Sequence, residues 1–166
     1  MYQVDKLDRL IELNGIPQSC VGAPEPVVLS DEGTTILAFY LQKTGQRFPA
    51  ENPTVDEPAA IVTFRPCYNF FFGAPNDEAM NGHPLYSRGL KAYSVFEVSN
   101  SSWVRYLEKM NSVHTMHDPK RFWERRHFIF TFHDSTFECV AKGFEIEKTS
   151  GSMGSIIPWM AEKLSR

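Results

Sequence analysis

The clearest alternation of apolar and polar residues lies between residues 127 and 147, and it predicts a β-hairpin. With the turn at Asp134 and Ser135, three phenylalanines of the first arm share one wholly apolar face with three residues of the second arm. The opposite face is mixed and carries both histidines of the first arm, partly exposed, so we expect a sheet that packs on one side only. The predicted pairs are Phe132 with Phe137, Phe130 with Cys139 and Phe128 with Ala141 on the apolar face, and Thr131 with Glu138, Ile129 with Val140 and His127 with Lys142 on the mixed face.

Shorter β-rich runs precede this hairpin. Residues 27–29 and 34–41 flank the turn-forming residues 31–33 and predict a second hairpin. Residues 60–72 are rich in β-branched and aromatic residues but contain Pro66, which cannot donate a ladder hydrogen bond. This run therefore predicts an edge strand, or two strands broken by a bulge. Residues 92–98 predict a further strand.

Helical spacing of apolar residues occurs in three places. Residues 4–13 predict an N-terminal helix that ends at Asn14 and Gly15. The serines of residues 99–102 offer N-caps to a central helix over residues 103–110, and Asp118-Pro119 marks the start of a short helical segment. Residues 152–164 predict a C-terminal amphipathic helix. The expected fold class is α+β: a mainly antiparallel sheet built from hairpins, with N-terminal, central and C-terminal helices.

Length and composition favour one globular domain over residues 1–166. The chain has 166 residues, 42% of them hydrophobic and 22% charged, which excludes disordered and coiled-coil classes. The polar, proline-containing residues 42–58 predict a surface loop, because the 41 residues before them are too few for a separate core. The alternating charge of the first nine residues differs from a signal peptide, and we expect a cytoplasmic protein.

Histidine placement suggests a candidate metal site. His114 and His117 have the i, i+3 spacing that can chelate a metal from one helical turn, and His133 could add a ligand. Such an ion would activate water for hydrolysis. However, a zinc site needs three or four converging ligands, and Asp118 and Asp134 are better explained as a cap and a turn residue. We therefore predict no bound metal and no other cofactor.

The long loop over residues 73–90 is the predicted ligand-binding region, because long loops inside a compact domain often bind something. An acid, an imidazole, a phenol and a guanidinium together suit a polar ligand or acid–base chemistry. The alternative is an ordinary surface loop that is polar for solubility, and we favour this alternative. The candidate residues are Asp77, Glu78, His83, Tyr86 and Arg88, of which Asp77, His83 and Arg88 are the catalytic candidates.

The charge is unevenly distributed. Residues 1–83 hold 11 acidic and 5 basic side chains, net −6, whereas residues 84–166 hold 9 and 12, net +3. Basic residues interleaved with aromatics over residues 120–126 can bind single-stranded nucleic acid, but the whole chain is acidic at net −3. We therefore predict a solvated helix face, with Phe122 and Trp123 turned inward, and no nucleic-acid or membrane partner.

Two functions remain open from the sequence. The first is a non-catalytic interaction module that binds a protein partner or itself. The second is a small metal-assisted or acid–base hydrolase that uses the 73–90 loop and the histidines of residues 114–134. Convergence of His83 with two of His114, His117, His133 or Asp77 would favour the hydrolase, because acid–base pairs and metal ligands need direct contact.

Overall fold

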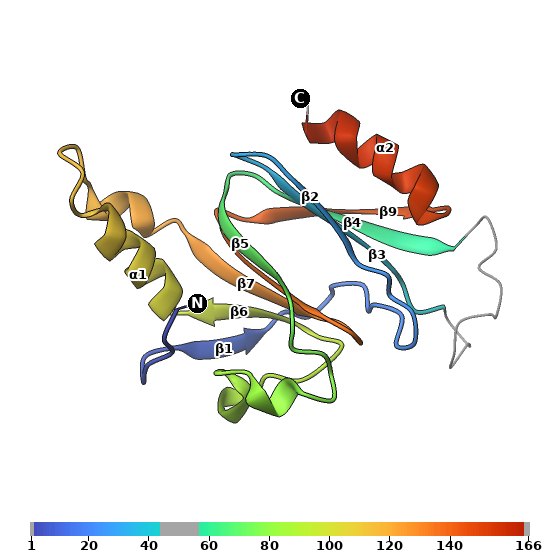
Figure 1. The fold of residues 1–166 in the computed structure, drawn as a ribbon, viewed down its shortest axis with the longest axis horizontal. Coiled ribbons are helices and arrows are strands. Elements are labelled where there is room, and N and C mark those ends of the chain that lie inside the picture. Colours follow the sequence, from blue (N-terminus) through green and yellow to red (C-terminus); the bar gives the residue numbers. More distant parts are fainter. Residues whose placement is uncertain (1, 44–56, 165–166) are drawn as a thin grey trace.

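The computed structural model describes residues 2–43 and 57–164, and in these ranges nine strands form two antiparallel sheets (Figure 1). The first sheet has the order β1 (Arg9–Glu12), β6 (Val95–Ser99), β7 (Arg126–Thr131), β8 (Thr136–Ala141) and β5 (Cys67–Gly73). The second sheet has the order β2 (Val27–Ser30), β3 (Thr35–Tyr40), β4 (Pro58–Phe64) and β9 (Phe144–Ser150). The helices are α1 (Ser102–Asn111) and α2 (Met153–Leu164), with short 3₁₀ turns η1 (Met80–Gly82), η2 (Tyr86–Arg88) and η3 (Pro119–Phe122).

The antiparallel, mixed α and β character is as predicted, but the N-terminal helix is wrong. Residues 9–12 form β1, which pairs with β6 and places Leu10 opposite Val98. The buried Asp8 carboxylate accepts hydrogen bonds from the backbone of Asp5 and from that of Ser102 at the start of α1. The pairing with β6 and the long-range contact with Ser102 outweigh a local helical periodicity that is only a weak preference. The central and C-terminal helices form at the predicted places.

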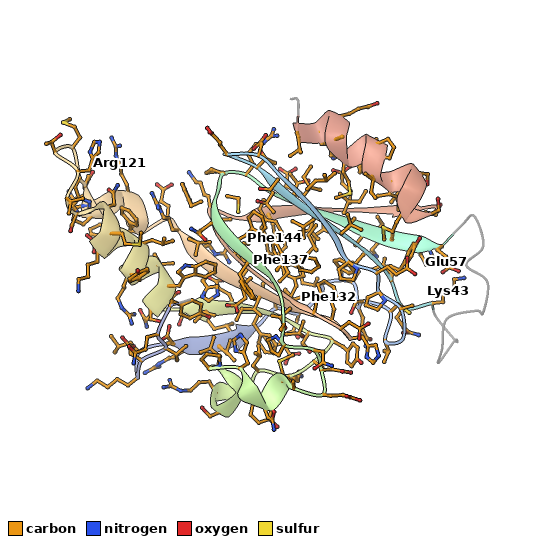
Figure 2. All side chains as sticks on the ribbon, in the orientation of Figure 1. Lys43, Glu57, Arg121, Phe132, Phe137 and Phe144 are labelled. Carbon is orange, nitrogen blue, oxygen red and sulfur yellow. The ribbon has the colours of Figure 1, made fainter. Side chains whose placement is uncertain are left out.

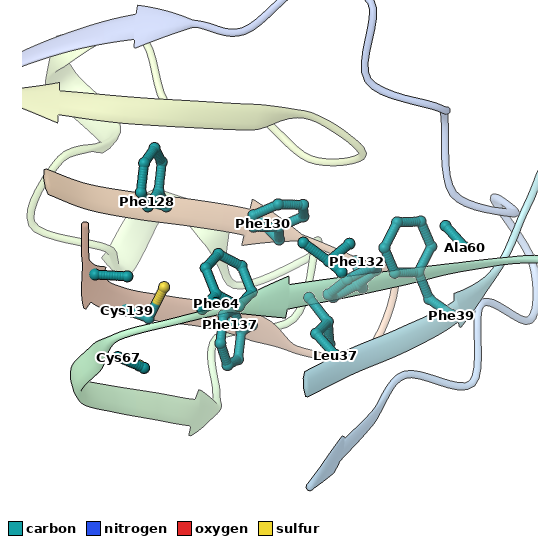
Figure 3. Close-up of a cluster of buried hydrophobic side chains, with 12 residues drawn as sticks. Leu37, Phe39, Ala60, Phe64, Cys67, Phe128, Phe130, Phe132, Phe137 and Cys139 are labelled. Atoms are coloured by element: carbon teal, nitrogen blue, oxygen red, sulfur yellow. The ribbon is translucent and has the colours of Figure 1, made fainter. Parts of the chain in front are cut away.

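The main core lies between the facing sides of the two sheets and is dominated by phenylalanine rings (Figures 2 and 3). Phe128, Phe130 and Phe132 are each at most 1% exposed, as the predicted apolar face requires. Their rings contact those of Phe39 and Phe64 from the second sheet at centroid distances of 5.2 to 6.4 Å. Such aromatic contacts add to the hydrophobic stabilisation of burial.

The β7–β8 hairpin forms with a register two residues away from the predicted one. Phe130 pairs with Phe137, and Ile129 pairs with Glu138. The backbone N–H of Phe132 donates to the carbonyl of Ser135 across the turn, at 2.8 Å, while the Phe132 ring packs into the core. Because a shift of two residues keeps every side chain on its face, the residues of each face are as predicted although the predicted partners are wrong. The expectation that the sheet packs on one side only is also wrong, because Ile129, Glu138 and Val140 of the mixed face are buried.

The chain passes from one sheet to the other at two adjacent corners. Pro66 separates β4 of the second sheet from β5 of the first, which confirms two strands and an edge position for β5. Gly143 separates β8 from β9, so the predicted hairpin arm ending at residue 147 is divided between the sheets. The N–H of Lys142 donates to the carbonyl of Pro66, at 3.1 Å, and joins the corners. Strands that switch sheets in this way make the corners of a β-sandwich.

Helices and loops cover the outer faces of both sheets (Figure 1). α2 covers the second sheet through Met153, Ile156 and Met160. The outer face of the first sheet is covered by α1, by the N-terminal residues and by the 73–94 segment. No helix among the described residues is long and apolar enough to cross a membrane. The cytoplasmic location stays a prediction, and most of the predicted 42–58 loop lies outside the described residues.

Candidate functional site

A buried carboxylate, Glu138, lies on the outer face of the first sheet and accepts three side-chain hydrogen bonds. The Tyr2 hydroxyl donates to Oε2 at 2.6 Å, and His127 Nε2 lies 2.9 Å from the same oxygen. His83 Nε2 lies 3.0 Å from Oε1. The Glu138 residue is 1% exposed. These donors replace water around the carboxylate, as burial of a charge requires.

The surrounding hydrogen bonds assign the protons of both imidazoles. The Leu85 N–H donates to His83 Nδ1 at 3.1 Å, so the His83 proton is on Nε2, facing Glu138. The Ser101 hydroxyl lies 2.9 Å from His127 Nδ1. His127 Nε2, which faces Oε2 of Glu138, donates to that carboxylate. We assign Glu138 as the ionised acceptor of both imidazole Nε2–H groups.

Hydrogen bonding keeps the Glu138 carboxyl ionised despite its burial. Burial alone would raise its pKa, but hydrogen bonds from His127 and His83, the electrostatic interaction with His127 and the hydrogen bond from Tyr2 lower the pKa to about 2. The same carboxylate acts in the opposite direction on Tyr2: burial and the negative charge of Glu138 raise the pKa of the phenol far above its usual range. The phenol therefore stays a proton donor at every physiological pH.

Ser101, His127 and Glu138 have the composition of a hydrolase triad, but their surroundings indicate a structural role. The Ser101 residue is 5% exposed, and its Oγ accepts a hydrogen bond from the Val104 N–H at the start of α1. A nucleophilic serine must reach a substrate carbonyl beside an oxyanion site. Here the serine acts as the N-cap of α1.

A pocket of about 360 Å³ lies above this network, between α1 and β5, and we call it the α1–β5 pocket. α1 contributes Trp103, Tyr106, Leu107 and Met110, which the helical period of 3.6 residues places on one side of the helix. Other lining residues are Tyr2, whose ring stacks on Trp103, Phe70 and Phe71 of β5, and Glu138. The pocket therefore combines apolar aromatic walls with one buried acid.

A second carboxylate–imidazole–phenol cluster lies at the surface. His133 Nδ1 is 2.9 Å from Asp77 Oδ2, and the Tyr93 hydroxyl donates to that same oxygen and lies 2.9 Å from His133 Nδ1. Tyr93 has a backbone φ of +56°, a strained value for a residue with a side chain. Among the described residues His133 Nε2 has no hydrogen-bond partner, and the side chain is 40% exposed.

The three groups of this cluster shift one another's proton affinity. Hydrogen bonds from Tyr93 and His133 lower the pKa of Asp77. Burial and the Asp77 carboxylate raise the pKa of Tyr93. The hydrogen bond to Asp77 raises the pKa of His133. A carboxylate that holds Nδ1 and leaves Nε2 exposed is the arrangement of an imidazole base.

The residues predicted from the 73–90 loop do not gather at one point. Asp77 joins the surface cluster, whereas His83 is drawn into the buried network. Arg88 donates to the backbone carbonyls of Asp5 and Asp8, which fixes the N-terminal turn. Glu78 and Tyr86 lie exposed on the surface.

The predicted metal histidines also lie apart from one another. His117 contacts Glu108 and Asn111, while His114 Nδ1 accepts from the Met116 N–H. Within residues 2–43 and 57–164, no three His, Cys, Asp or Glu side chains are grouped to hold a metal ion. His133 lies in the surface cluster, so the three candidate ligands do not converge.

Two further expectations about side chains are wrong. His127 is fully buried and not on a partly exposed face, because Tyr2 and Trp103 pack edge-on against its ring. Trp123 is 76% exposed, although Phe122 beside it is buried as predicted. The short η3 turn can direct only one of these neighbouring rings inward.

Sequence reasoning missed Glu138, Tyr2 and Tyr93. The pattern offered one indication of Glu138: it is the only charged residue in the mostly apolar run 136–141. An acid in such a strand is either on a solvated face or paired inside the protein. Comparison of the chain with known protein families, with curated proteins and with solved structures found no match to any of them.

Proposed function

We propose that the protein is an interaction module that pairs with a second copy of itself through the free edge of β5. β8 is the one neighbour of β5 among the described strands, so the other edge of β5 has no strand partner there, although the N–H of Cys67 at its start donates to the carbonyl of Gly33. Exposed edges of this kind pair readily with another strand unless charges, bulges or short length prevent it. The observation that carries the proposal is the composition of this edge, Cys-Tyr-Asn-Phe-Phe-Phe-Gly, which has no charge.

The other edges of the two sheets are protected in ways that β5 is not. β9 carries Glu145, Glu147 and Lys148 at exposed positions. β1 carries Arg9 and Glu12 and has four residues, and β2 also has four. Charged and very short edges discourage strand addition. β5 combines seven residues with exposed aromatic side chains.

The part of β5 that follows its bulge suits pairing with an identical strand. The register shifts between Cys67 and Asn69, and from Asn69 to Gly73 it is regular. Phe70 and Phe72 are 41% and 38% exposed and share one face. A two-fold axis at Phe71 would pair Phe70 with the partner's Phe72 in an antiparallel ladder. Cross-strand aromatic pairs of this type stabilise a sheet, and two-fold pairing makes a closed dimer.

Sedimentation equilibrium tests the proposal. We expect a mass of twice the 19.0 kDa chain at micromolar concentrations. Phe72→Lys places a charge on the edge and should yield single chains, whereas Trp123→Lys makes the same kind of change at another exposed aromatic and should leave the dimer intact. Single chains of the unmodified protein, or a dimer that survives Phe72→Lys, would contradict the proposal.

The surface cluster favours a second candidate function, acid–base hydrolysis without a metal. His133 has the raised proton affinity and the exposed Nε2 that a general base needs. The hydrolysis of p-nitrophenyl acetate as a function of pH would test it. We expect His133→Gln to remove the activity and His114→Gln, at another exposed histidine, to retain it. Equal activity in both variants would exclude a special role for His133.

A further inference from the structure

We infer that the α1–β5 pocket binds a small organic cation, a primary ammonium group carried on an aromatic or aliphatic body. This inference does not rest on the proposed pairing of β5, although Phe70 and Phe71 of that strand line the pocket. It begins from the charge at the floor of the pocket. Glu138 is ionised and accepts hydrogen bonds from Tyr2, His83 and His127. Among the described residues it is the one charged residue that lines the pocket, and apart from Asn69 the other lining residues are aromatic or apolar.

The carboxylate also keeps hydrogen-bonding capacity. Oε2 accepts from Tyr2 and His127, whereas among the described residues Oε1 accepts from His83 alone. A carboxylate oxygen has two lone pairs, so Oε1 has room for one further donor. An ammonium group supplies both a donor and a positive charge opposite the carboxylate. Neither a neutral alcohol nor a carboxylate supplies both.

The walls of the pocket suit the body of such a ligand. The rings of Tyr2 and Trp103 stack at 5.2 Å between centroids, and Tyr106 is 53% exposed beside them. Aromatic faces carry partial negative charge and attract cations, most strongly at sites shielded from water. A volume of about 360 Å³ lies in the range of pockets that take small molecules.

The basic side chains of α1 are not placed to neutralise Glu138. Arg105 is bound to the Asp5 carboxylate and to the Asn100 carbonyl. Lys109 is not among the lining residues. No basic side chain of the described residues therefore lines the pocket beside Glu138.

The fluorescence of Trp103 provides the test. The protein carries Trp123→Phe and Trp159→Phe, so that Trp103 is its one remaining tryptophan. The probes are 2-phenylethylammonium, 2-phenylethanol and 3-phenylpropionate, which share a phenyl group and differ in charge. We expect the Trp103 fluorescence to change and to saturate as the cation is added. The alcohol should bind with an affinity about tenfold weaker, and the anion should not bind. Equal binding of cation and alcohol, or no saturation with the cation, would overturn the inference.

Two variants assign the binding to this pocket. Glu138→Gln should abolish the preference for the cation over the alcohol. This variant disturbs a buried network and could fail to fold, so Tyr106→Lys provides a second test. It places a positive charge at an exposed position of the pocket wall, and the cation should no longer bind. Phe72→Lys, which is designed to separate the two copies, should bind the cation as the unmodified protein does. Cation binding that survives Tyr106→Lys would contradict the site.

Discussion

The two polar clusters use the same chemical groups and differ in their access to water. Each has one carboxylate that contacts imidazole and phenol: Glu138 with Tyr2 and two histidines, and Asp77 with Tyr93 and one histidine. The side chain of Glu138 is 2% exposed, and that of His133 is 40% exposed. Both oxygens of the buried carboxylate have partners, whereas among the described residues one imidazole nitrogen of the surface cluster has none.

This difference indicates what each cluster does. Unpaired polar groups in a low-dielectric interior are costly, so the buried network contributes to stability chiefly because its removal would leave donors unsatisfied. In the surface cluster water can replace a lost partner, and little stability depends on it. Carboxylate, imidazole and phenol therefore stabilise the fold in the buried cluster, and in the surface cluster they are the groups on which the second proposed function depends. The predictions below test this contrast by removing one group at a time.

The largest expected effect is that of Glu138→Leu. This change leaves the Tyr2 hydroxyl and two imidazole N–H groups buried without an acceptor. We expect the free energy of unfolding to fall by about 3–5 kcal/mol, measured by urea denaturation. Glu145→Leu, at an exposed position of β9, serves as the control and should change it by no more than about 0.5 kcal/mol. A loss of similar size in both variants would show that the buried network has no special role.

The second largest expected effect is the loss of stability when Glu138 becomes protonated at low pH. The folded pKa of Glu138 is about 2, below its ordinary value of 4.5, so the unfolded chain binds the proton first as the pH falls. The stabilisation is therefore complete above pH 4.5 and is lost progressively down to about pH 2, by about 3 kcal/mol. Urea denaturation at several pH values should show a shallower slope for Glu138→Gln over this range. An unchanged slope would contradict the assigned ionisation.

Removing a single donor should have a smaller effect. Tyr2→Phe deletes the hydroxyl that donates to Glu138 Oε2 and leaves the ring against Trp103. We expect a loss of about 2 kcal/mol in unfolding free energy, typical of a hydrogen bond to a charged group. Tyr86→Phe, at an exposed phenol, is the matched control and should have almost no effect. If both variants retain full stability, the Tyr2 hydrogen bond contributes nothing.

The sequence predicted the faces of strands better than their partners. The alternation around Phe128, Phe130 and Phe132 identifies the core side because side chains on a strand have a strict period of two. It cannot fix the register, since a shift of two residues preserves the same faces. The N-terminal segment was harder: its helical spacing is local, whereas its strand depends on pairing with β6 and on the Asp8 carboxylate at α1.

The candidate site was partly predictable for a similar reason. Asp77 and His133 both stand out as chemically active residues, but 56 positions separate them, and nothing in the spacing indicates that they meet. Their contact is fixed by the fold: the Asp77 N–H donates to the His133 carbonyl at 2.9 Å, which ties the loop to the hairpin turn. Glu138 was assigned to the mixed face, and only the packing of α1 and the 73–94 segment over that face makes it buried.

The smallest expected effect on stability, and the clearest on proton affinity, is that of Asp77→Asn. The hydrogen bond to Asp77 raises the pKa of His133, so the amide should let it fall toward its ordinary value near 6.5. The NMR titration of the His133 ring protons measures this change directly. Asp134→Asn alters a neighbouring charge without removing the hydrogen bond and should lower the pKa less. A His133 pKa that stays the same in Asp77→Asn would mean that the carboxylate does not hold the imidazole in solution. His133 would then be an ordinary exposed histidine, without the hydrogen bond to Asp77 that distinguishes it.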